Sequence, residues 1–136
     1  MILPNTTASD VDKYAASPEI QIIENSTEAQ AVRHTKLHLL AVNFWEDKIK
    51  TVDFINCDKR ASVIILKDAD VLNISVSDPT WKNQRTICLT IKVQASQVIS
   101  KDNEVKVESL GSYVTLRINV NGSRGKAYRA TIKILD

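Results

Sequence analysis

The sequence predicts an all-β protein, an antiparallel β-sandwich with one short N-terminal helix. Along most of the chain, short apolar stretches alternate with polar residues at a period of two, which is typical of strands with one buried face. Turn-forming residues interrupt these stretches roughly every eight to twelve residues, as they do in sandwiches. No helical pattern lies between the strands, which argues against a parallel sheet.

The clearest part of this pattern is the segment 62–80, which predicts two strands joined by a tight connection. The first strand is a short, mostly β-branched run at residues 63–66, and the polar sequence KDAD follows it. In the second strand, apolar side chains occupy every second position, at Leu72, Ile74 and Val76. Pro79 ends this strand because proline has no N–H to donate to a ladder.

The N-terminal region predicts the only helix, over residues 5–16. Thr7 and Asp10 have the spacing of a capping box, in which the threonine hydroxyl accepts a hydrogen bond from a free amide of the first turn. Ser17 ends the helix, since a residue before proline disfavours the α conformation. Residues 2–3 resemble the end of a strand, and residues 20–23 predict a short strand.

Residues 29–45 predict period-two strand structure that continues through two histidines, His34 and His38. On a strand, a spacing of four puts both imidazoles on one face but about 13 Å apart. That separation is too large for one metal ion, so we interpret both histidines as surface or half-buried residues.

The remaining strands are predicted by further apolar or alternating groups, at residues 54–57, 87–93, 98–99, 105–107, 114–120 and 126–135. Asn121-Gly122 is a strong tight-turn signal, and the segment 122–125 predicts the tip of a hairpin. In the last strand, one face is apolar, with Ala130, Ile132 and Ile134.

Length and charge limit the classes of function. The chain has 136 residues, which suits one domain. Its formal net charge of +2 gives no reason to expect a nucleic-acid or membrane partner. No apolar run approaches the roughly 18 residues of a membrane-spanning helix, and the N-terminus does not resemble a signal peptide. If the parent protein is secreted, we expect its signal to lie upstream and this chain to be a fragment.

The sequence shows no residues that would form a catalytic or metal site. A glycine-rich phosphate loop and a nucleophile elbow are missing, and Asp68 and Asp70 lack the other ligands of a calcium loop. Cys57 and Cys88 are best explained as two core thiols, with a disulfide between them as the alternative. We therefore predict no catalytic residue, no metal ion and no cofactor.

Trp81 is the strongest candidate for contact with a ligand. Indole faces stack on sugars, and an exposed tryptophan calls for an explanation. Trp81 lies in a polar loop with Lys82 and Arg85, and we predict that these three residues bind carbohydrate. Packing against a neighbouring domain is the competing interpretation for Trp81 and the favoured one for Trp45.

Several segments, in order, resemble the C-terminal region of polysaccharide lyase family 8, which contains hyaluronate, chondroitin AC and xanthan lyases. The resemblance begins with MILPNTTASDVDKYAASPEIQIIENSTEAQAV at residues 1–32 and continues with Asn43-Phe44-Trp45. It then extends through Ala61-Ser62-Val63 and Val76-Ser77-Asp78-Pro79-Thr80. It thus covers nearly the whole chain, and within the family it is strongest for the hyaluronate lyases.

The resemblance implies a secreted bacterial enzyme that cleaves uronic-acid glycosaminoglycans by β-elimination. The catalytic residues of the family lie in an N-terminal toroid, and their motifs are not found in this sequence. The resemblance therefore implies a non-catalytic domain that supports the substrate cleft. Residues 1–26 would be the end of the central β-domain plus a linker helix, and residues 27–136 would be the C-terminal sandwich.

The expected partners are the other domains of the parent lyase and a polyanionic glycan, hyaluronan or chondroitin. Exposed basic residues are candidates for facing that glycan: Lys82, Arg85, Arg124, Lys126 and Arg129. A solvated strand face explains these charges equally well. The alternative function is an independent carbohydrate-binding or adhesin module.

Overall fold

The structure, a computed structural model, describes residues 4–135. Within them, one helix, α1 (Ala8–Ala16), precedes the strands β1 (Ile20–Asn25), β2 (Ala29–His34), β3 (Leu39–Phe44), β4 (Lys50–Val52), β5 (Ile55–Cys57), β6 (Ala61–Asp68), β7 (Val71–Ser77), β8 (Thr86–Ile91), β9 (Ala95–Lys101), β10 (Val105–Ser109), β11 (Val114–Asn119) and β12 (Tyr128–Ile134). The predicted all-β architecture with one short N-terminal helix is confirmed. The predicted strand end at residues 2–3 lies outside the described residues.

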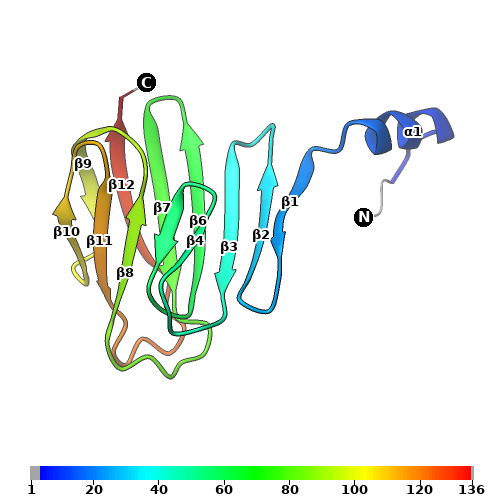
Figure 1. Ribbon diagram of the computed structural model, residues 1–136. Helices are drawn as coiled ribbons and strands as arrows, with labels where there is room; N and C mark the ends of the chain where they lie inside the picture. The colour runs from blue at the N-terminus through cyan, green and yellow to red at the C-terminus, as the bar shows by residue number, and fades with distance from the viewer. Residues whose placement is uncertain (1–3, 136) are drawn as a thin grey trace.

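The strands form two antiparallel sheets that face each other (Figure 1). The large sheet has seven strands in the order β1-β2-β3-β6-β7-β12-β9, and the small sheet has five in the order β10-β11-β8-β5-β4. The predicted pair at residues 62–80 is confirmed as β6 and β7, which are paired from Ser62 with Ser77 to Asp68 with Val71. This pair lies near the centre of the large sheet.

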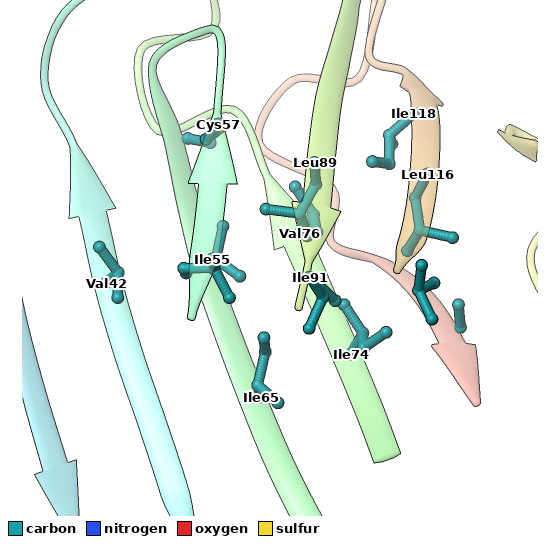
Figure 2. Packing of buried hydrophobic residues seen from close by; sticks show 14 of the residues in the cluster. Val42, Ile55, Cys57, Ile65, Ile74, Val76, Leu89, Ile91, Leu116 and Ile118 are labelled. Atoms are coloured by element: carbon teal, nitrogen blue, oxygen red, sulfur yellow. The ribbon is translucent and has the colours of Figure 1, made fainter. Parts of the chain in front are cut away.

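The core lies between the sheets, where the central strands contribute every second side chain, whereas the edge strand β1 has no buried residue. Ile65 of β6 and Ile74 of β7 face Leu89 of β8 and Leu116 of β11 across the interior (Figure 2). The predicted apolar faces of β7 and β12 are buried as expected, with Ile132 completely inaccessible to solvent. Burial of these faces provides the main favourable free energy of folding.

The helix α1 has the predicted capping box but not the predicted start. The Thr7 hydroxyl accepts a hydrogen bond from the Asp10 amide, and the Asp10 carboxylate accepts one from the Thr7 amide. The helix begins at Ala8 rather than at residue 5, because Asn5 has a left-handed backbone with φ of 58°. None of the helical residues is buried, and α1 lies beyond the β1 edge of the large sheet (Figure 1).

The region 29–45 differs from the prediction, because it forms a hairpin rather than continuous strand structure. His34 ends β2 and is paired with Leu39, the first residue of β3. His38 lies in the intervening turn with φ of 50°, so the two histidines do not share a strand face. No glycine, proline or asparagine lies in this turn to indicate it in the sequence. The buried face of β3 consists of Leu40, Val42 and Phe44.

The segment 121–127 also differs from the prediction. It does not form a hairpin tip, because β11 belongs to the small sheet and β12 to the large sheet. The turn at Asn121-Gly122 thus begins a crossover between the two sheets. Sequence reasoning missed β4 entirely, since this strand has only three residues.

The strand β1 lies on the N-terminal side of the domain boundary predicted between residues 26 and 27. It is nevertheless paired with β2, from Ile20 opposite His34 to Asn25 opposite Gln30. It is therefore the edge strand of the large sheet, and α1 is the element that precedes the sandwich.

Shortening a side chain at the centre of this core tests the sandwich packing. Leu89 is fully buried on β8, so Leu89→Ala should lower the free energy of unfolding by roughly 2–5 kcal/mol through lost burial and a cavity. Urea unfolding of the 136-residue chain measures the change. Ile99→Ala on β9 is the control, because Ile99 is 50% exposed and should change stability by no more than about 0.5 kcal/mol. Equal effects would contradict the observed core.

Candidate functional site

The loop at residues 78–85, which joins β7 to β8, is organised by a buried carboxylate, Asp78. One oxygen, Oδ1, accepts hydrogen bonds from the Thr80 amide at 2.9 Å and the Thr80 hydroxyl at 2.7 Å. The other, Oδ2, accepts one from the Asn83 amide at 2.8 Å. The Asn83 side chain in turn donates to the Arg60 carbonyl at 3.0 Å. The loop is therefore fixed at both of its ends.

The environment of Asp78 favours its ionised form. Burial alone would raise the pKa of this carboxyl, but the hydrogen bonds from Thr80, Asn83 and the Trp81 amide outweigh it and lower the pKa below its ordinary value. Sequence reasoning used the Asp78-Pro79 pair only as a strand terminator. It did not consider that the short side chain of an aspartate at the end of a strand can accept hydrogen bonds from the amides of the following loop.

The three predicted carbohydrate-binding residues lie on this loop. Trp81 is 70% exposed and has a left-handed backbone with φ of 60°. Its indole lies against the backbone of Gly125 in the crossover, where an added Cβ would lie 2.5 Å from the indole Nε1. Lys82 and Arg85 are also exposed. The structure thus joins the 78–85 loop to the crossover at Gly125, a contact that sequence reasoning did not anticipate.

Of the other basic candidates, Arg124 precedes Gly125 in the crossover that the Trp81 indole contacts, whereas Lys126 and Arg129 have other neighbours. Lys126 lies over the ring of Tyr128, with its Nζ 4.8 Å from the ring centroid, and 3.3 Å from Glu104 Oε1. Arg129 lies on the outer face of the large sheet, opposite Ser75. These two charges are accounted for by local contacts and by a solvated strand face.

The histidines and cysteines form no shared site. His34 Nε2 lies 3.7 Å from Glu19. Both cysteines are free, and the register explains why. Cys57 is paired with Leu89 and points into the core, so Cys88 points to the opposite face. Burial raises the pKa of the Cys57 thiol to about 12. Within residues 4–135, no group of three or more His, Cys, Asp or Glu side chains could hold a metal ion.

The outer face of the large sheet has one apolar row over β1, β2, β3 and β6, and we call this row the apolar face. It is a row of facing residues across four strands: Ile22, Val32, Ala41 and Ile64. Ile22 is 73% exposed and Ile64 is 48% exposed. The same row becomes polar where it reaches Ser75 and Arg129 on β7 and β12. The adjoining row of Gln30, Asn43 and Ser62 is polar.

A solvated sheet face is normally polar, so an apolar row across four strands is typical of a surface that another structure covers. The sequence carried a partial signal for it. The run at residues 63–66 is apolar at successive positions, as in strands that are buried on both faces. Among the described residues, no helix is long and apolar enough to cross a membrane.

Comparisons with known proteins agree on one family. The family model for the C-terminal β-sandwich domain of polysaccharide lyase family 8 matches residues 21–87. A xanthan lyase from Bacillus sp. (strain GL1) is 37% identical over 135 residues, which are 98% of this chain and 14% of that protein. A hyaluronate lyase from Enterococcus faecalis is 26% identical over 98% of this chain and 13% of that protein.

A solved structure of Paenibacillus xanthan lyase superposes on this chain with a TM-score of 0.94 at 42% identity. The match covers 98% of this chain and 13% of the lyase chain. The chain therefore spans about one seventh of the length of the xanthan lyase relative.

The role of Asp78 can be tested with Asp78→Asn, which preserves the size of the side chain. The new NH2 group cannot accept a hydrogen bond from the loop amides, so the free energy of unfolding at neutral pH should fall by about 1–3 kcal/mol. Because the native pKa is lowered, the carboxylate stabilises the fold above the unfolded pKa of about 3.9 and loses this effect as the pH falls through the native pKa. The difference from wild type should therefore shrink below roughly pH 4.

Urea unfolding at a series of pH values measures this difference. Asp68→Asn is the matched control, since Asp68 is exposed at the end of β6, and it should change stability by at most about 0.5 kcal/mol. A pH-independent loss in Asp78→Asn would contradict the ionised, hydrogen-bonded role.

Proposed function

The chain belongs to polysaccharide lyase family 8 as a C-terminal β-sandwich domain, and we propose that it is the non-catalytic C-terminal domain of a longer, secreted lyase. In this proposal, catalysis takes place in the remainder of the parent protein, and the sandwich supports the substrate cleft. The apolar face is the observation that carries the proposal. In an isolated module, this row of two isoleucines and a valine would stay exposed to water, which is unfavourable for apolar side chains.

The covering partner in this proposal is the part of the parent lyase that precedes β1. Two observations on the β1 side of the molecule support this choice. The helix α1 buries none of its residues, and Val11 on it is 46% exposed. Ile22 on β1, the edge strand beside α1, is the most exposed residue of the apolar face. A domain connected through α1 would cover both surfaces at once.

The proposed substrate of the parent is a uronic-acid polysaccharide, cleaved by β-elimination. The resemblance in the sequence favoured hyaluronan or chondroitin, whereas the xanthan lyase has higher identity to this chain than the hyaluronate lyase. Xanthan therefore joins these two polymers as a candidate. Such polymers are too large to enter a cell, which supports secretion of the parent.

The second candidate function is a carbohydrate-binding module that acts within or apart from the lyase. The exposure of Trp81 favours it, because the indole is fixed by Gly125 while 70% of the residue stays accessible. Lys82, next to it in the chain, would supply a cation for a uronate. This candidate requires no apolar face, so the two proposals have separate tests.

The docking role predicts that a charge on the apolar face weakens the parent lyase but not the isolated chain. Ile64→Lys would place an ammonium group in a buried interface, where an unpaired charge is costly. In the parent, we expect the sandwich to become detachable by limited proteolysis and the activity to fall. Release of unsaturated product from hyaluronan, chondroitin and xanthan, followed by its ultraviolet absorbance, measures that activity.

Ser75→Lys is the matched control, because Ser75 lies beside Ile64 in the same row, at the position where the row becomes polar. It should leave the parent unchanged. In the 136-residue chain, both variants should unfold within about 0.5 kcal/mol of wild type. Equal behaviour of the two variants in the parent would refute docking through the apolar face.

The carbohydrate-binding role predicts that Trp81→Ala removes glycan binding by the isolated chain. Loss of a stacked aromatic ring should weaken binding about tenfold or more. Titration with oligosaccharides of hyaluronan, chondroitin and xanthan, followed by calorimetry, measures the affinity. Tyr113→Ala is the control, since Tyr113 is an aromatic residue that is 50% exposed and lies at the end of β8 opposite the 78–85 loop. Unchanged binding in Trp81→Ala would exclude stacking on this indole.

A further inference from the structure

Two segments connect the sheets at the Trp81 end of the sandwich, and they lie side by side (Figure 1). The 78–85 loop runs from β7 to β8, and the crossover, residues 121–127, runs from β11 to β12. Because β7 pairs with β12 and β8 pairs with β11, the two segments join the same two strand pairs in opposite directions. Their ends are held together by the outermost paired residues of these ladders: Val76 with Tyr128, and Thr86 with Asn119.

The two segments meet where the Trp81 indole lies on Gly125. A Cβ at residue 125 would lie 2.5 Å from the indole Nε1 and 3.3 Å from Cδ1, so only glycine lets the ring approach this closely. Gly125 also has a φ of 82°, which glycine adopts at little cost. The ring is thus supported on one side, while 70% of the residue stays exposed. Gly125 is therefore a positioning residue for Trp81.

The two segments together carry four basic residues: Lys82, Arg85, Arg124 and Lys126. Lys126 is paired with Glu104. Lys82, Arg85 and Arg124 are exposed, and in the part of the chain that the structure describes none of these three forms an ion pair. Arg124 directly precedes the glycine that supports the indole. The surface around Trp81 therefore has cations that are not already neutralised.

The carboxylates of this end of the molecule have other partners. Asp78, the only acidic residue of the two segments, is buried, and both of its oxygens accept hydrogen bonds from the 78–85 loop. In the turn between β9 and β10, Glu104 lies 3.3 Å from Lys126 Nζ, and Asp102 accepts a hydrogen bond from the Arg129 amide at 2.9 Å. An anion at Trp81 would therefore meet an excess of positive charge.

We propose that the 78–85 loop and the crossover form one site for a uronate-containing oligosaccharide, in which the Trp81 indole stacks on a sugar ring and Arg124 binds the carboxylate of a neighbouring uronate. A guanidinium can bind a carboxylate through two parallel hydrogen bonds, which an ammonium group cannot do. An aromatic ring beside free cations matches a ligand that has both an apolar C–H face and negative charge. The choice of a saccharide rests on the carbohydrate-binding role proposed above, to which this site adds Arg124 and Gly125.

The role of Arg124 is tested by calorimetric titration of the 136-residue chain with a hyaluronan tetrasaccharide. Arg124→Ala should weaken this binding about tenfold, the usual effect of losing one charge-assisted contact. Arg124→Lys should restore only part of it, because the charge returns without the paired hydrogen bonds. Binding of cellotetraose, a neutral sugar of the same length, should not change in Arg124→Ala.

Lys92→Ala is the control for charge. Lys92 is exposed and follows the last residue of β8, whereas the 78–85 loop precedes the first residue of that strand. This variant should bind the hyaluronan tetrasaccharide like wild type. Equal losses in Lys92→Ala and Arg124→Ala would overturn the proposal as non-specific charge attraction.

The role of Gly125 is tested by Gly125→Ala, whose Cβ would displace the indole. It should weaken binding of the hyaluronan tetrasaccharide as much as Trp81→Ala does. Gly122→Ala is the matched control, since Gly122 also has a left-handed backbone, with φ of 69°, but nothing lies within 4 Å of an added Cβ. Both variants therefore carry similar backbone strain, and only Gly125→Ala should lose binding. Equal binding by the two variants would contradict the positioning role.

The remaining outcomes separate this site from the functions proposed above. Loss of binding in Trp81→Ala without any loss in Arg124→Ala would reject the joint site and leave carbohydrate binding by Trp81 intact. Equal or tighter binding of hexaglutamate would overturn the proposal in favour of an acidic peptide. Failure of every oligosaccharide to bind the folded chain would reject both this site and the carbohydrate-binding role. The docking role would be unaffected, since Ile64→Lys tests it separately.

Discussion

The structure depends on one constraint, that the central strands bury alternate side chains between two antiparallel sheets. Leu89 and Ile91 of the small sheet and Ile65 and Ile74 of the large sheet meet in this interior. Because the period of a strand is two, burial of one set of side chains forces the other set outward. The residue types on the inner faces are therefore restricted by the packing of the core. Those on the outer faces are not, so they can differ according to what the domain contacts.

The two ends of the sandwich differ in structure. At one end, the buried carboxylate of Asp78 accepts hydrogen bonds from the amides of the 78–85 loop. In the same loop, the Trp81 indole lies against Gly125. At the other end, the sheets separate enough to leave a cleft, which is lined by Leu40 and Leu72 of the large sheet and by Phe54 and Lys92 on the side of the small sheet. The loop end therefore holds an exposed aromatic ring on a hydrogen-bonded support, whereas the cleft end is bounded by buried side chains of the core.

Sequence reasoning succeeded where the apolar period was long and its turns were marked. The pair β6 and β7 and the strand β12 were predicted with the correct buried faces. It failed where a turn lacked its usual residues, as at 35–38 between His34 and Leu39. It also failed where a strong turn signal, Asn121-Gly122, marked a crossover between sheets rather than a hairpin. Which strands pair is decided by tertiary packing, and local turn chemistry does not encode it.

The candidate sites also divide into features that the sequence indicates and features that depend on the tertiary fold. Trp81 stood out from composition alone, but its support at Gly125, about forty-four residues away, depends on the crossover topology. The apolar face could not be predicted, because it depends on which strands pair and in which register, and the sequence pattern fixes neither. The apolar face is the more informative of the two about the whole protein. One outward-facing row of the large sheet is apolar over β1, β2, β3 and β6 and polar over β7 and β12. Water alone does not explain this change along one row, whereas a partner that covers only the β1 side, as proposed, would explain it.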